Sequence, residues 1–333
     1  MEIQQQVDLK SFNSFAVSAI AAEFAEVTDP AQLPMLFDYA ESSYLPVFLL
    51  GGGSNLLWVN DFPGLVIHMA NKGMEFDEAN TRVQVAAGEG WHHLVTRCIE
   101  KSFYGIENLA LIPGSVGAAP VQNIGAYGVE LASYVDQVSV YDRGQKCFRV
   151  LDREDCEFSY RDSLFKQEAG QGLVITGVTL QLSRDWEPVL DYPALRDQLS
   201  SDSPAPQQVF DTVCAIRRSK LPDPANLGNA GSFFKNPVIS IDKYKILKEE
   251  FSDIPSYPTE DPELVKLPAA WLLDTLGWKG RQRGAAAVHD QHALVLVNPG
   301  TASGEDIYLL AQEMSSAVLS RFGIALQPEV TIL

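Results

Sequence analysis

The chain has 333 residues, of which 46% are hydrophobic and 20% are charged, and its formal net charge is −18. This length allows two or three domains, and the composition predicts large hydrophobic cores and excludes long disordered tracts. The negative charge argues against binding to nucleic acid or to an anionic membrane surface, because the overall field repels both. An anionic ligand therefore needs a local cluster of Lys and Arg.

The cysteines Cys98, Cys147, Cys156 and Cys214 form no C-x-x-C pair and no zinc spacing, which is typical of reduced cysteines in a cytosolic protein. Met1–Lys10 has no apolar signal core, and no stretch of the sequence is long and apolar enough to cross a bilayer. We therefore expect a cytoplasmic protein.

In chain order, hydrophobic periodicity and turn residues predict alternating helices and strands. Asp29 and Pro30 suit a helix start, because Asp can cap a helix and Pro is favoured in its first turn. Helices are predicted over residues 31–41, 91–101, 193–199, 207–218, 240–251, 268–276 and 303–322. Strands are predicted on both sides of the glycines in 46–57 and over 65–69, 82–86, 135–141, 147–151, 173–182, 287–298 and 325–333.

The adjacent histidines His92 and His93 lie in one of these helices and are the candidate for a metal site. No H-E-x-x-H motif accompanies them, and we find no carboxylate partner at helical spacing in the sequence. A pair on a helix surface is the better interpretation, and we predict no metal.

The stretch 46–57, PVFLLGGGSNLL, interrupts an apolar run with three glycines. Glycines allow positive φ and close approach of a ligand, and consecutive N–H groups can form a nest for a pyrophosphate. A tight turn between two strands explains the same residues. No Gly-Lys-Ser/Thr follows, and Leu56 replaces the last glycine of the dinucleotide fingerprint. A nucleotide bound here would therefore lie outside the common α/β nucleotide folds.

The segment 111–128, LIPGSVGAAPVQNIGAYG, consists mostly of small residues. A surface loop rich in Gly and Ala is one explanation. The segment has few of the polar side chains that a solvated loop carries, which favours a backbone wall packed against a large, flat ligand.

Three further segments carry polar groups suited to chemistry. Arg217, Arg218 and Lys220 end a predicted helix, where cations complement the helix dipole and also form the best anion site of this acidic chain. The segment 228–237, GNAGSFFKNP, exposes backbone around a serine but has no G-x-S-x-G elbow. The run 160–163, YRDS, is either a surface turn or part of a site.

Seven segments of the chain occur in an order that resembles the family of UDP-N-acetylenolpyruvoylglucosamine reductases. They are LGGGSN (50–55), IPGSVG (112–117), NIGAYG (123–128), YRDS (160–163), KLPDP (220–224), GSFFKNP (231–237) and PEV (328–330). The resemblance covers nearly the whole chain, and its specificity comes from the number and order of the motifs.

The resemblance implies an α+β fold: a vanillyl-alcohol-oxidase (PCMH)-type FAD-binding domain of two subdomains plus a third α+β substrate-binding domain. The implied ranges are 1–70 for the first FAD-binding subdomain, 71–218 for the second, and 219–322 for the substrate-binding domain. The C-terminal strand, 323–333, is expected to return to the second subdomain.

The resemblance also implies FAD, bound non-covalently, as the cofactor. The residues expected to hold its pyrophosphate are Gly51, Gly52, Gly53, Ser54, Asn55, Pro113, Gly114, Ser115, Val116 and Gly117. The residues expected to line the flavin are Asn123, Gly125, Ala126 and Tyr127.

The implied reaction belongs to peptidoglycan precursor synthesis. NADPH, as co-substrate, reduces the flavin, and flavin N5 then gives hydride to the vinyl carbon of UDP-N-acetylglucosamine enolpyruvate, forming UDP-N-acetylmuramate. Catalytic roles follow for Arg161, which clamps the substrate carboxylate, for protonated Glu329, which stabilises the developing charge, and for Ser232, which protonates the carbanion. One preorganised donor of this kind typically lowers a barrier by ~3–4 kcal/mol.

Substrate contacts are implied for Tyr192, Arg217, Lys220, Asn236, Tyr257 and His292. The Pro-rich loop that carries Tyr257 is similar to that of the longer subtype of the family. Gln291 competes with His292 for the site-facing position, and Ala118 and Gln327 depart from residues common in the family.

We expect a monomer that acts on a small molecule, with no nucleic-acid or membrane partner. Two other functions explain part of the sequence. Another FAD-linked oxidase of sugars or alcohols would use both small-residue walls but not Ser232, Lys220 and Glu329 together. A non-catalytic flavin-binding scaffold or sensor would leave the serine, arginine and glutamate without a role.

Overall fold

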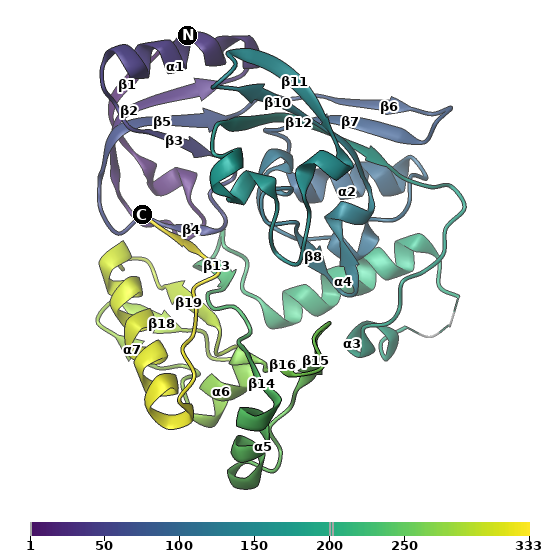
Figure 1. Cartoon of the computed structure of the whole chain (residues 1–333), viewed down its shortest axis with the longest axis vertical. Helices are drawn as coiled ribbons and strands as arrows, with labels where there is room; N and C mark the ends of the chain where they lie inside the picture. The colour runs from purple at the N-terminus through teal and green to yellow at the C-terminus, as the bar shows by residue number, and fades with distance from the viewer. Residues whose placement is uncertain (1, 200, 202) are drawn as a thin grey trace. The chain divides into compact units, whose positions relative to one another are not determined.

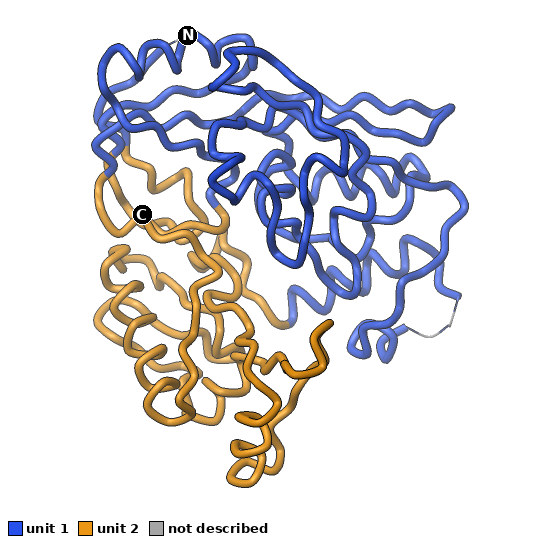
Figure 2. Tube along the Cα trace, viewed as in Figure 1, with its two compact units in different colours: residues 1–7, 21–53, 62–219 blue, residues 8–20, 54–61, 220–333 orange. Residues whose placement is uncertain are grey.

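The computed structural model describes residues 2–199, 201 and 203–333, and the chain divides into two compact units (Figure 2). Unit 1 comprises residues 1–7, 21–53 and 62–219, and unit 2 comprises residues 8–20, 54–61 and 220–333. The chain thus passes from one unit to the other inside the glycine-rich stretch, between Gly53 and Ser54. The three predicted domain ranges remain a prediction.

The smaller sheet has the order β1-β2-β5-β3, in which β2, β5 and β3 run parallel. Its strands are β1 (Gln4–Asp8), β2 (Ile20–Val27), β5 (Phe62–Met69) and β3 (Val47–Leu50). Helix α1 (Leu33–Ser42) buries Leu33 and Leu36 in one hydrophobic cluster with Val27 and Ile67 of the sheet. As predicted, Asp29 caps the start of this region, where its side chain accepts a hydrogen bond from the backbone of Ala31 before a short 3₁₀ turn.

The larger sheet of unit 1 is antiparallel and has the order β11-β10-β12-β7-β6 (Figure 1). Its strands are β11 (Cys147–Asp152), β10 (Val135–Asp142), β12 (Leu173–Gln181), β7 (Arg82–Ala86) and β6 (Met74–Asp77). Alternate residues of β7 and β10, such as Val83 and Val138, point into one core. Helix α2 (Trp91–Glu100) and helix α4 (Pro206–Lys220) contribute Trp91 and Val213 to that core. Unit 1 also contains α3 (Pro193–Arg196) and the short pair β8 (Gly125–Ala126) and β9 (Val129–Glu130).

Unit 2 contains three small sheets with the strand orders β13-β19-β18-β17, β14-β16-β15 and β20-β4. Its strands are β4 (Leu56–Leu57), β13 (Gly228–Ser232), β14 (Val238–Ser240), β15 (Tyr257–Pro258), β16 (Leu264–Lys266), β17 (Gln282–Arg283), β18 (Ala286–Val288), β19 (Val295–Asn298) and β20 (Thr331–Ile332). Its helices are α5 (Ile241–Glu250), α6 (Ala269–Thr275) and α7 (Gly304–Phe322). Helix α7 begins at a capping box of Ser303 and Asp306 and ends at Gly323, whose φ is 64°.

Most predicted elements are confirmed, but two predicted strands are wrong in extent. Residues 287–298 form a hairpin of β18 and β19 instead of one strand, because the backbone N–H of His289 donates to Val295 O across a polar turn. The C-terminal strand is only Thr331–Ile332 and pairs with β4 of unit 2, instead of returning to the range 71–218. Pro328, which has no N–H to donate, precedes this short strand.

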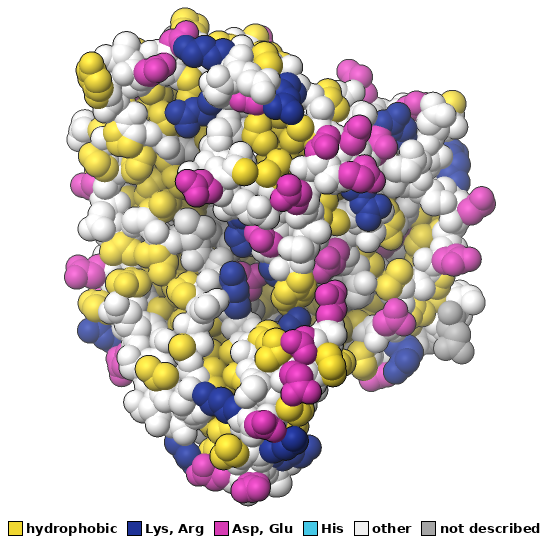
Figure 3. Space-filling model, viewed as in Figure 1, with side chains coloured by type: hydrophobic (Ala, Val, Ile, Leu, Met, Phe, Trp, Pro, Cys, Tyr) yellow, Lys and Arg dark blue, Asp and Glu magenta, His cyan; other side chains and the backbone are white. Residues whose placement is uncertain are grey.

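In the described part of the chain, no helix is long and apolar enough to cross a membrane. Acidic side chains are spread over the visible face instead of being gathered in one patch (Figure 3).

Candidate cofactor and active site

The two small-residue segments of unit 1 lie so close together that there is no room for side chains between their backbones. We call this arrangement the glycine cradle; it consists of Gly51–Gly53 with Gly114 and Ser115. An ideal Cβ at Gly51 would lie 2.6 Å from Ser115 Oγ, and one at Gly52 would lie 2.8 Å from Gly114 Cα. Gly53 has a φ of 60°, which glycine adopts without the steric penalty of other residues. The structure therefore explains why each of these positions is glycine: Gly51 and Gly52 because of close packing, and Gly53 because of its backbone conformation.

Polar groups of the cradle are left for a ligand. Ser115 Oγ is buried without a hydrogen-bond partner among the described residues. The backbone N–H groups of Gly52 and Gly53 also donate no hydrogen bond within the part of the chain that the structure covers. Buried polar groups in proteins are almost always paired. The hydroxyl and the two N–H groups, beside a backbone that carries no side chains, therefore fit an anionic group such as a pyrophosphate.

Val116 and Gly117, two further predicted cofactor residues, secure the cradle to the protein. Their backbone N–H groups donate to Glu89 O and Ala87 O, each at 2.8 Å. An ideal Cβ at Gly117 would lie 2.5 Å from Ala87 Cβ, so this glycine is required for packing. A cofactor role for these two residues remains a prediction, and it must use atoms other than these amides.

The predicted flavin wall includes the tight hairpin of β8 and β9. Its central residues Tyr127 and Gly128 have φ values of 51° and 85°, as a two-residue hairpin turn with the right twist requires. Buried Asn108 holds this turn, because its Nδ2 donates to Tyr127 O at 2.8 Å and to Val189 O at 2.9 Å. No pattern in the sequence indicates this role of Asn108, since one asparagine among apolar residues resembles a surface residue.

Arg161 lies on a four-residue turn that is closed by reciprocal backbone bonds between Ser159 and Asp162, at 3.0 and 3.2 Å. Its own φ is 56°, an uncommon conformation for a non-glycine residue. The guanidinium donates to Gly125 O at 2.6 Å and to Asn123 O at 3.4 Å. The predicted carboxylate clamp is thus attached to the predicted flavin wall.

Asn123 has its side chain engaged within the protein. Its Nδ2 donates to Glu130 Oε2 at 2.9 Å and to Ser159 O at 3.0 Å, and its Oδ1 accepts from the backbone N–H of Ala132 at 2.9 Å. Only 1% of Asn123 is exposed. Its amide therefore holds the turn of Arg161. Its backbone is engaged as well, because the N–H donates to Pro120 O at 3.1 Å and the carbonyl accepts from Arg161. A contact of Asn123 with the cofactor remains a prediction.

Tyr127, Tyr192 and Arg217 form a further cluster in unit 1. The two tyrosine rings meet edge to face, with centroids 5.2 Å apart and planes at 86°. Burial raises the pKa of Tyr127 and lowers the pKa of Arg217. Arg217 Nε is buried without a partner among the described residues, so this guanidinium keeps a donor for a ligand.

In unit 2, Ser232 lies at the end of β13, directly after an irregularity in its pairing with β19. Asn229 pairs with Val297 and Ser232 pairs with Val295, so the chain from 229 to 232 carries one residue more than its partner. Gly231 accommodates this with a φ of 69°. Bulges of this type redirect a side chain relative to the regular strand, here the side chain of Ser232.

Glu329 is held beside the segment that follows Ser232. Its backbone N–H donates to Phe233 O at 2.8 Å, and the N–H of Lys235 donates to Gln327 O at 2.9 Å. Asn55 Nδ2 donates to Glu329 O at 3.2 Å. Asn55, predicted to bind the cofactor, therefore also fixes the backbone of Glu329, a role that spacing in the sequence does not reveal.

The remaining predicted substrate residues of unit 2 lie in different elements. Lys220 ends α4 and is exposed, and Tyr257 of β15 is 54% exposed. Asn236 Oδ1 accepts a hydrogen bond from the backbone N–H of Ala269 at 2.9 Å, at the start of α6. This bond leaves the Nδ2 group of Asn236 to donate to a ligand.

His292 is half-buried, whereas the neighbouring Gln291 is exposed. The backbone N–H of Leu294 donates to His292 Nδ1 at 3.3 Å, and burial lowers the pKa of this imidazole. Which of the two residues faces a substrate remains a prediction.

The histidine pair of α2 is only partly a surface pair. His92 Nδ1 accepts a hydrogen bond from the backbone N–H of Leu111 at 3.1 Å, and its ring stacks on Phe210 at 5.6 Å. His93 does have a carboxylate at helical spacing, because Glu89 lies 3.7 Å from its Nδ1, so the expectation of none was wrong. Among the described residues, no three His, Cys, Asp or Glu side chains are grouped as a metal site.

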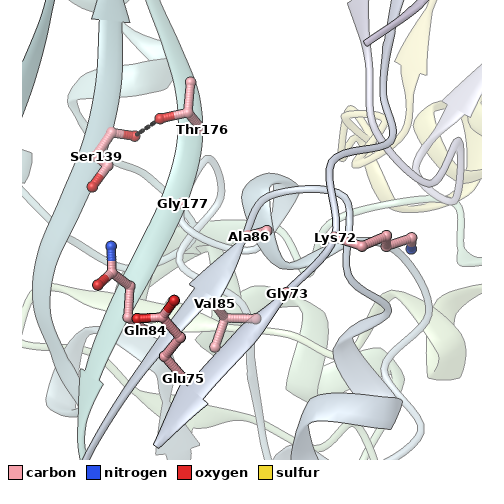
Figure 4. Close-up of a pocket in the computed structure, with 9 residues that line it drawn as sticks. All are labelled: Lys72, Gly73, Glu75, Gln84, Val85, Ala86, Ser139, Thr176 and Gly177. Carbon is pink, nitrogen blue, oxygen red and sulfur yellow. Dashed lines mark hydrogen bonds between the residues drawn. The ribbon is translucent and has the colours of Figure 1, made fainter. Parts of the chain in front are cut away.

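A polar hollow of about 330 Å³ lies on the larger sheet of unit 1 (Figure 4). Lys72, Glu75 and Gln84 contribute to its lining, and Thr176 Oγ1 donates to Ser139 O at 3.2 Å. The lining contains no residue that the sequence predicts for the site.

Comparison with known domains defines the class of the protein. Residues 21–150 match the FAD binding domain, and residues 223–333 match the C-terminal domain of UDP-N-acetylenolpyruvoylglucosamine reductase. The chain is therefore an α+β flavoprotein with a vanillyl-alcohol-oxidase (PCMH)-type FAD-binding domain and a second, C-terminal domain. The predicted fold class and the predicted cofactor, FAD, are confirmed.

Whole-chain relatives define the family. The chain is 47% identical to UDP-N-acetylenolpyruvoylglucosamine reductase of Pasteurella multocida, over 98% of this chain and 96% of the relative. It is 45% identical to the enzyme of the same name from Chromobacterium violaceum, over 100% of this chain and 99% of the relative. The crystal structure of UDP-N-acetylenolpyruvylglucosamine reductase from Thermus caldophilus has the same fold, with a TM-score of 0.70 at 24% identity over 100% of this chain and 99% of that one. The chain belongs to the family of UDP-N-acetylenolpyruvoylglucosamine reductases, as its motifs predicted.

Proposed function

We propose that this protein reduces UDP-N-acetylglucosamine enolpyruvate to UDP-N-acetylmuramate with NADPH as the reductant. Membership of the family makes the chain an FAD-dependent oxidoreductase of peptidoglycan precursor synthesis. The observation that carries the proposed chemistry is the pairing in unit 2, where the N–H of Glu329 donates to Phe233 O, next to Ser232. This pairing holds the backbone of Glu329 next to the segment that follows Ser232, although the two residues are far apart in the sequence.

The glycine cradle and Arg217 hold the cofactor and an anionic part of a ligand in this proposal. Gly51–Gly53 and Gly114 offer backbone without side chains, and Ser115 offers a buried hydroxyl without a partner among the described residues. When bound, FAD supplies the two-electron carrier that links oxidation of NADPH to reduction of the vinyl carbon. The protein itself supplies orientation, charge and a proton.

Ser232 supplies the proton. Hydride addition to the vinyl carbon leaves negative charge on the adjacent carbon, and that carbon is a far stronger base than a serine alkoxide. Transfer from Ser232 Oγ to the carbon is therefore downhill, although a serine hydroxyl is a weak acid. The bulge before Ser232 aims the hydroxyl, because it interrupts the regular alternation of side chains along β13.

Glu329 and Arg161 stabilise the charge that spreads into the substrate carboxylate. Protonated Glu329 donates a hydrogen bond to an oxygen that gains charge, and the guanidinium of Arg161 balances the carboxylate. Arg161 stands on a turn closed at 3.0 and 3.2 Å, and its guanidinium bonds to Gly125 O. This support keeps the cation oriented before the substrate arrives.

The sugar nucleotide is held through Tyr192, Lys220, Asn236, Tyr257 and His292 in this proposal, with Lys220 at the pyrophosphate. Because the same cationic groups must serve NADPH and the sugar nucleotide in turn, we expect ping-pong kinetics. We further propose that the protein is cytoplasmic and monomeric, and that it acts without a nucleic-acid or membrane partner.

An anaerobic titration tests the proposal. The bound flavin is first bleached with one equivalent of NADPH, and UDP-N-acetylglucosamine enolpyruvate is then added without oxygen. The expected result is rapid return of the oxidised flavin spectrum together with one equivalent of UDP-N-acetylmuramate. A flavin that stays bleached until oxygen is admitted would contradict the proposal and favour an oxidase or a flavin-binding scaffold.

A further inference from the structure

Asn229 is a buried polar residue that has no assigned role in the proposed reaction. Only 2% of it is exposed. Its Nδ2 donates to Pro222 O at 3.1 Å and to Leu227 O at 2.8 Å, while its Oδ1 accepts from the backbone N–H of Gly231 at 2.9 Å. Both ends of the amide are therefore engaged inside unit 2.

These bonds join two functional segments. Pro222 follows Lys220 by two residues, and Gly231 directly precedes Ser232. The bond to Gly231 lies inside the bulge, where φ of Gly231 is 69° and the register with β19 shifts. The extra residue of a bulge is left without a ladder partner, and here the Asn229 amide provides a bond in its place, to the N–H of Gly231.

We propose that Asn229 is a positioning residue that holds Ser232 and the segment following Lys220 in a fixed position relative to each other. The amide connects the residue that protonates the substrate with the loop that follows Lys220, the proposed pyrophosphate contact at the end of α4. This inference rests on the proposed function, because the roles of Ser232 and Lys220 belong to that proposal.

The chemistry of the contacts requires an amide at position 229. The carbonyls of Pro222 and Leu227 need two N–H donors, and the N–H of Gly231 needs an acceptor. Aspartate has the same shape and keeps the acceptor, but it places an oxygen against both carbonyls. Asn229→Asp therefore releases the segment after Lys220 and breaks its link to the bulge, while changing almost no volume.

Asn298 provides a matched control in the same sheet. It is 4% exposed, and its backbone pairs with Gly228 next to Asn229. Its Nδ2 donates to Phe15 O at 2.9 Å, and its Oδ1 accepts from the N–H groups of Gly300 and Ala302 at 2.8 and 2.9 Å. Asn298→Asp thus makes the same chemical change at the same depth, and it removes no side-chain hydrogen bond to the segments of Ser232 or Lys220.

The experiment compares the two half-reactions of the FAD-loaded full chain by anaerobic stopped flow. For Asn229→Asp we expect flavin reduction by NADPH within about twofold of the wild type. Reoxidation by UDP-N-acetylglucosamine enolpyruvate should slow by about 100-fold, the loss typical of a misplacement of 1 Å. The solvent deuterium isotope effect on reoxidation should also rise, because proton transfer from a displaced hydroxyl becomes rate-limiting. Asn298→Asp should keep the wild-type reoxidation rate and isotope effect, whatever its stability.

Equal reoxidation rates and isotope effects in Asn229→Asp and Asn298→Asp would overturn the inference. If either variant does not fold, Asn229→Ser and Asn298→Ser replace the pair, since serine at position 229 keeps an acceptor for Gly231 and loses a donor. In that pair, only Asn229→Ser should slow reoxidation and raise the isotope effect, and equal values would again refute the role. The proposed function fails separately, when the wild-type flavin itself is not reoxidised by the enolpyruvyl substrate.

Discussion

The glycine cradle of unit 1 and the Ser232–Glu329 pair of unit 2 are built on opposite principles. In the cradle, the proposed function depends on the absence of side chains, because a Cβ at Gly52 would lie 2.8 Å from the backbone of Gly114. In the pair, the proposed function depends on two side chains whose backbones are paired across almost 100 residues, through the bond from Glu329 N–H to Phe233 O. A large, flat cofactor needs an open wall, whereas proton transfer needs one atom in one place. Substitutions in the two regions should therefore fail in different ways.

The largest effect is expected from Ser232→Ala. Without the hydroxyl, the carbanion has no positioned proton donor, so product formation should fall by about 10²–10⁴-fold. Reduction of the flavin by NADPH should remain at the wild-type rate, because the cradle is untouched. Stopped-flow absorbance of the two half-reactions measures both. Wild-type steady-state turnover in this variant would remove Ser232 from the mechanism.

Glu329→Ala should lower turnover by about 10²–10³-fold, the usual loss on removal of one preorganised donor. Glu329→Gln keeps an N–H donor of similar length and should retain more activity than the alanine variant. The ranking is measured as kcat with saturating NADPH and enolpyruvyl substrate. If the two variants are equally impaired, donation of a hydrogen bond is not the contribution of Glu329.

In the cradle, Gly52→Ala should weaken FAD binding, because the added methyl group meets the backbone of Gly114 and the loop must move. We expect loss of about 10-fold or more in affinity, equal to about 1.4 kcal/mol, with little change in turnover per bound flavin. The flavin-to-protein absorbance ratio after gel filtration measures this. Gly172→Ala is the matched control, since nothing lies within 4 Å of an ideal Cβ there. A flavin loss that is the same in both variants would mean that the cradle does not hold the cofactor.

The smallest expected effect is a change in folding stability with pH, to which one histidine in each unit contributes. Burial lowers the pKa of both His92 and His292 in the folded protein. Between the lowered value and the ordinary value of about 6.5, the unfolded chain binds more protons than the folded chain. Stability should therefore fall as pH decreases below about 6.5, until the folded pKa is passed.

His92→Gln and His292→Gln should each reduce this pH dependence. Urea unfolding at pH values between about 5 and 8 measures the slope. The residues that act on the charge of His292 are Asp274, which favours it, and Lys279, His289 and Lys220, which oppose it. A pH slope that is unchanged in both variants would show that other groups govern stability in this range.

Prediction from sequence succeeded where a local pattern is sufficient. The helix 91–101 was recognised from the spacing of Trp91, Leu94 and Val95, all of which are buried in α2 (Trp91–Glu100). The capped start near Asp29 and the helix after Ser303 were recognised in the same way. The strand pattern failed at 287–298, because a polar turn inside an apolar run can continue a strand or reverse it. Only the partner strand decides between these outcomes.

The same limit applies to the site. Motif order identified the family and the cofactor, and the family comparison bears out both. The structural bonds of Asn55, Asn108 and Asn229 were not predicted, because an asparagine that joins distant backbone segments has no local signature. Their amides bond to Glu329 O, to Tyr127 O and to Pro222 O, respectively.

The sequence by itself determined the chemical inventory of this protein: two small-residue segments, a cationic helix end, and the residues Arg161, Ser232 and Glu329. The small-residue segments are visible in the composition, because glycine and alanine stand out where side chains are missing. The residues Arg161, Ser232 and Glu329 were singled out by the resemblance of the motifs to the family. Only the tertiary structure decided that Gly52 meets Gly114 and that Glu329 pairs next to Ser232. Contacts between segments far apart in the chain depend on how whole helices and strands pack. Many core residues together determine that packing, so the residues of the site alone do not predict it.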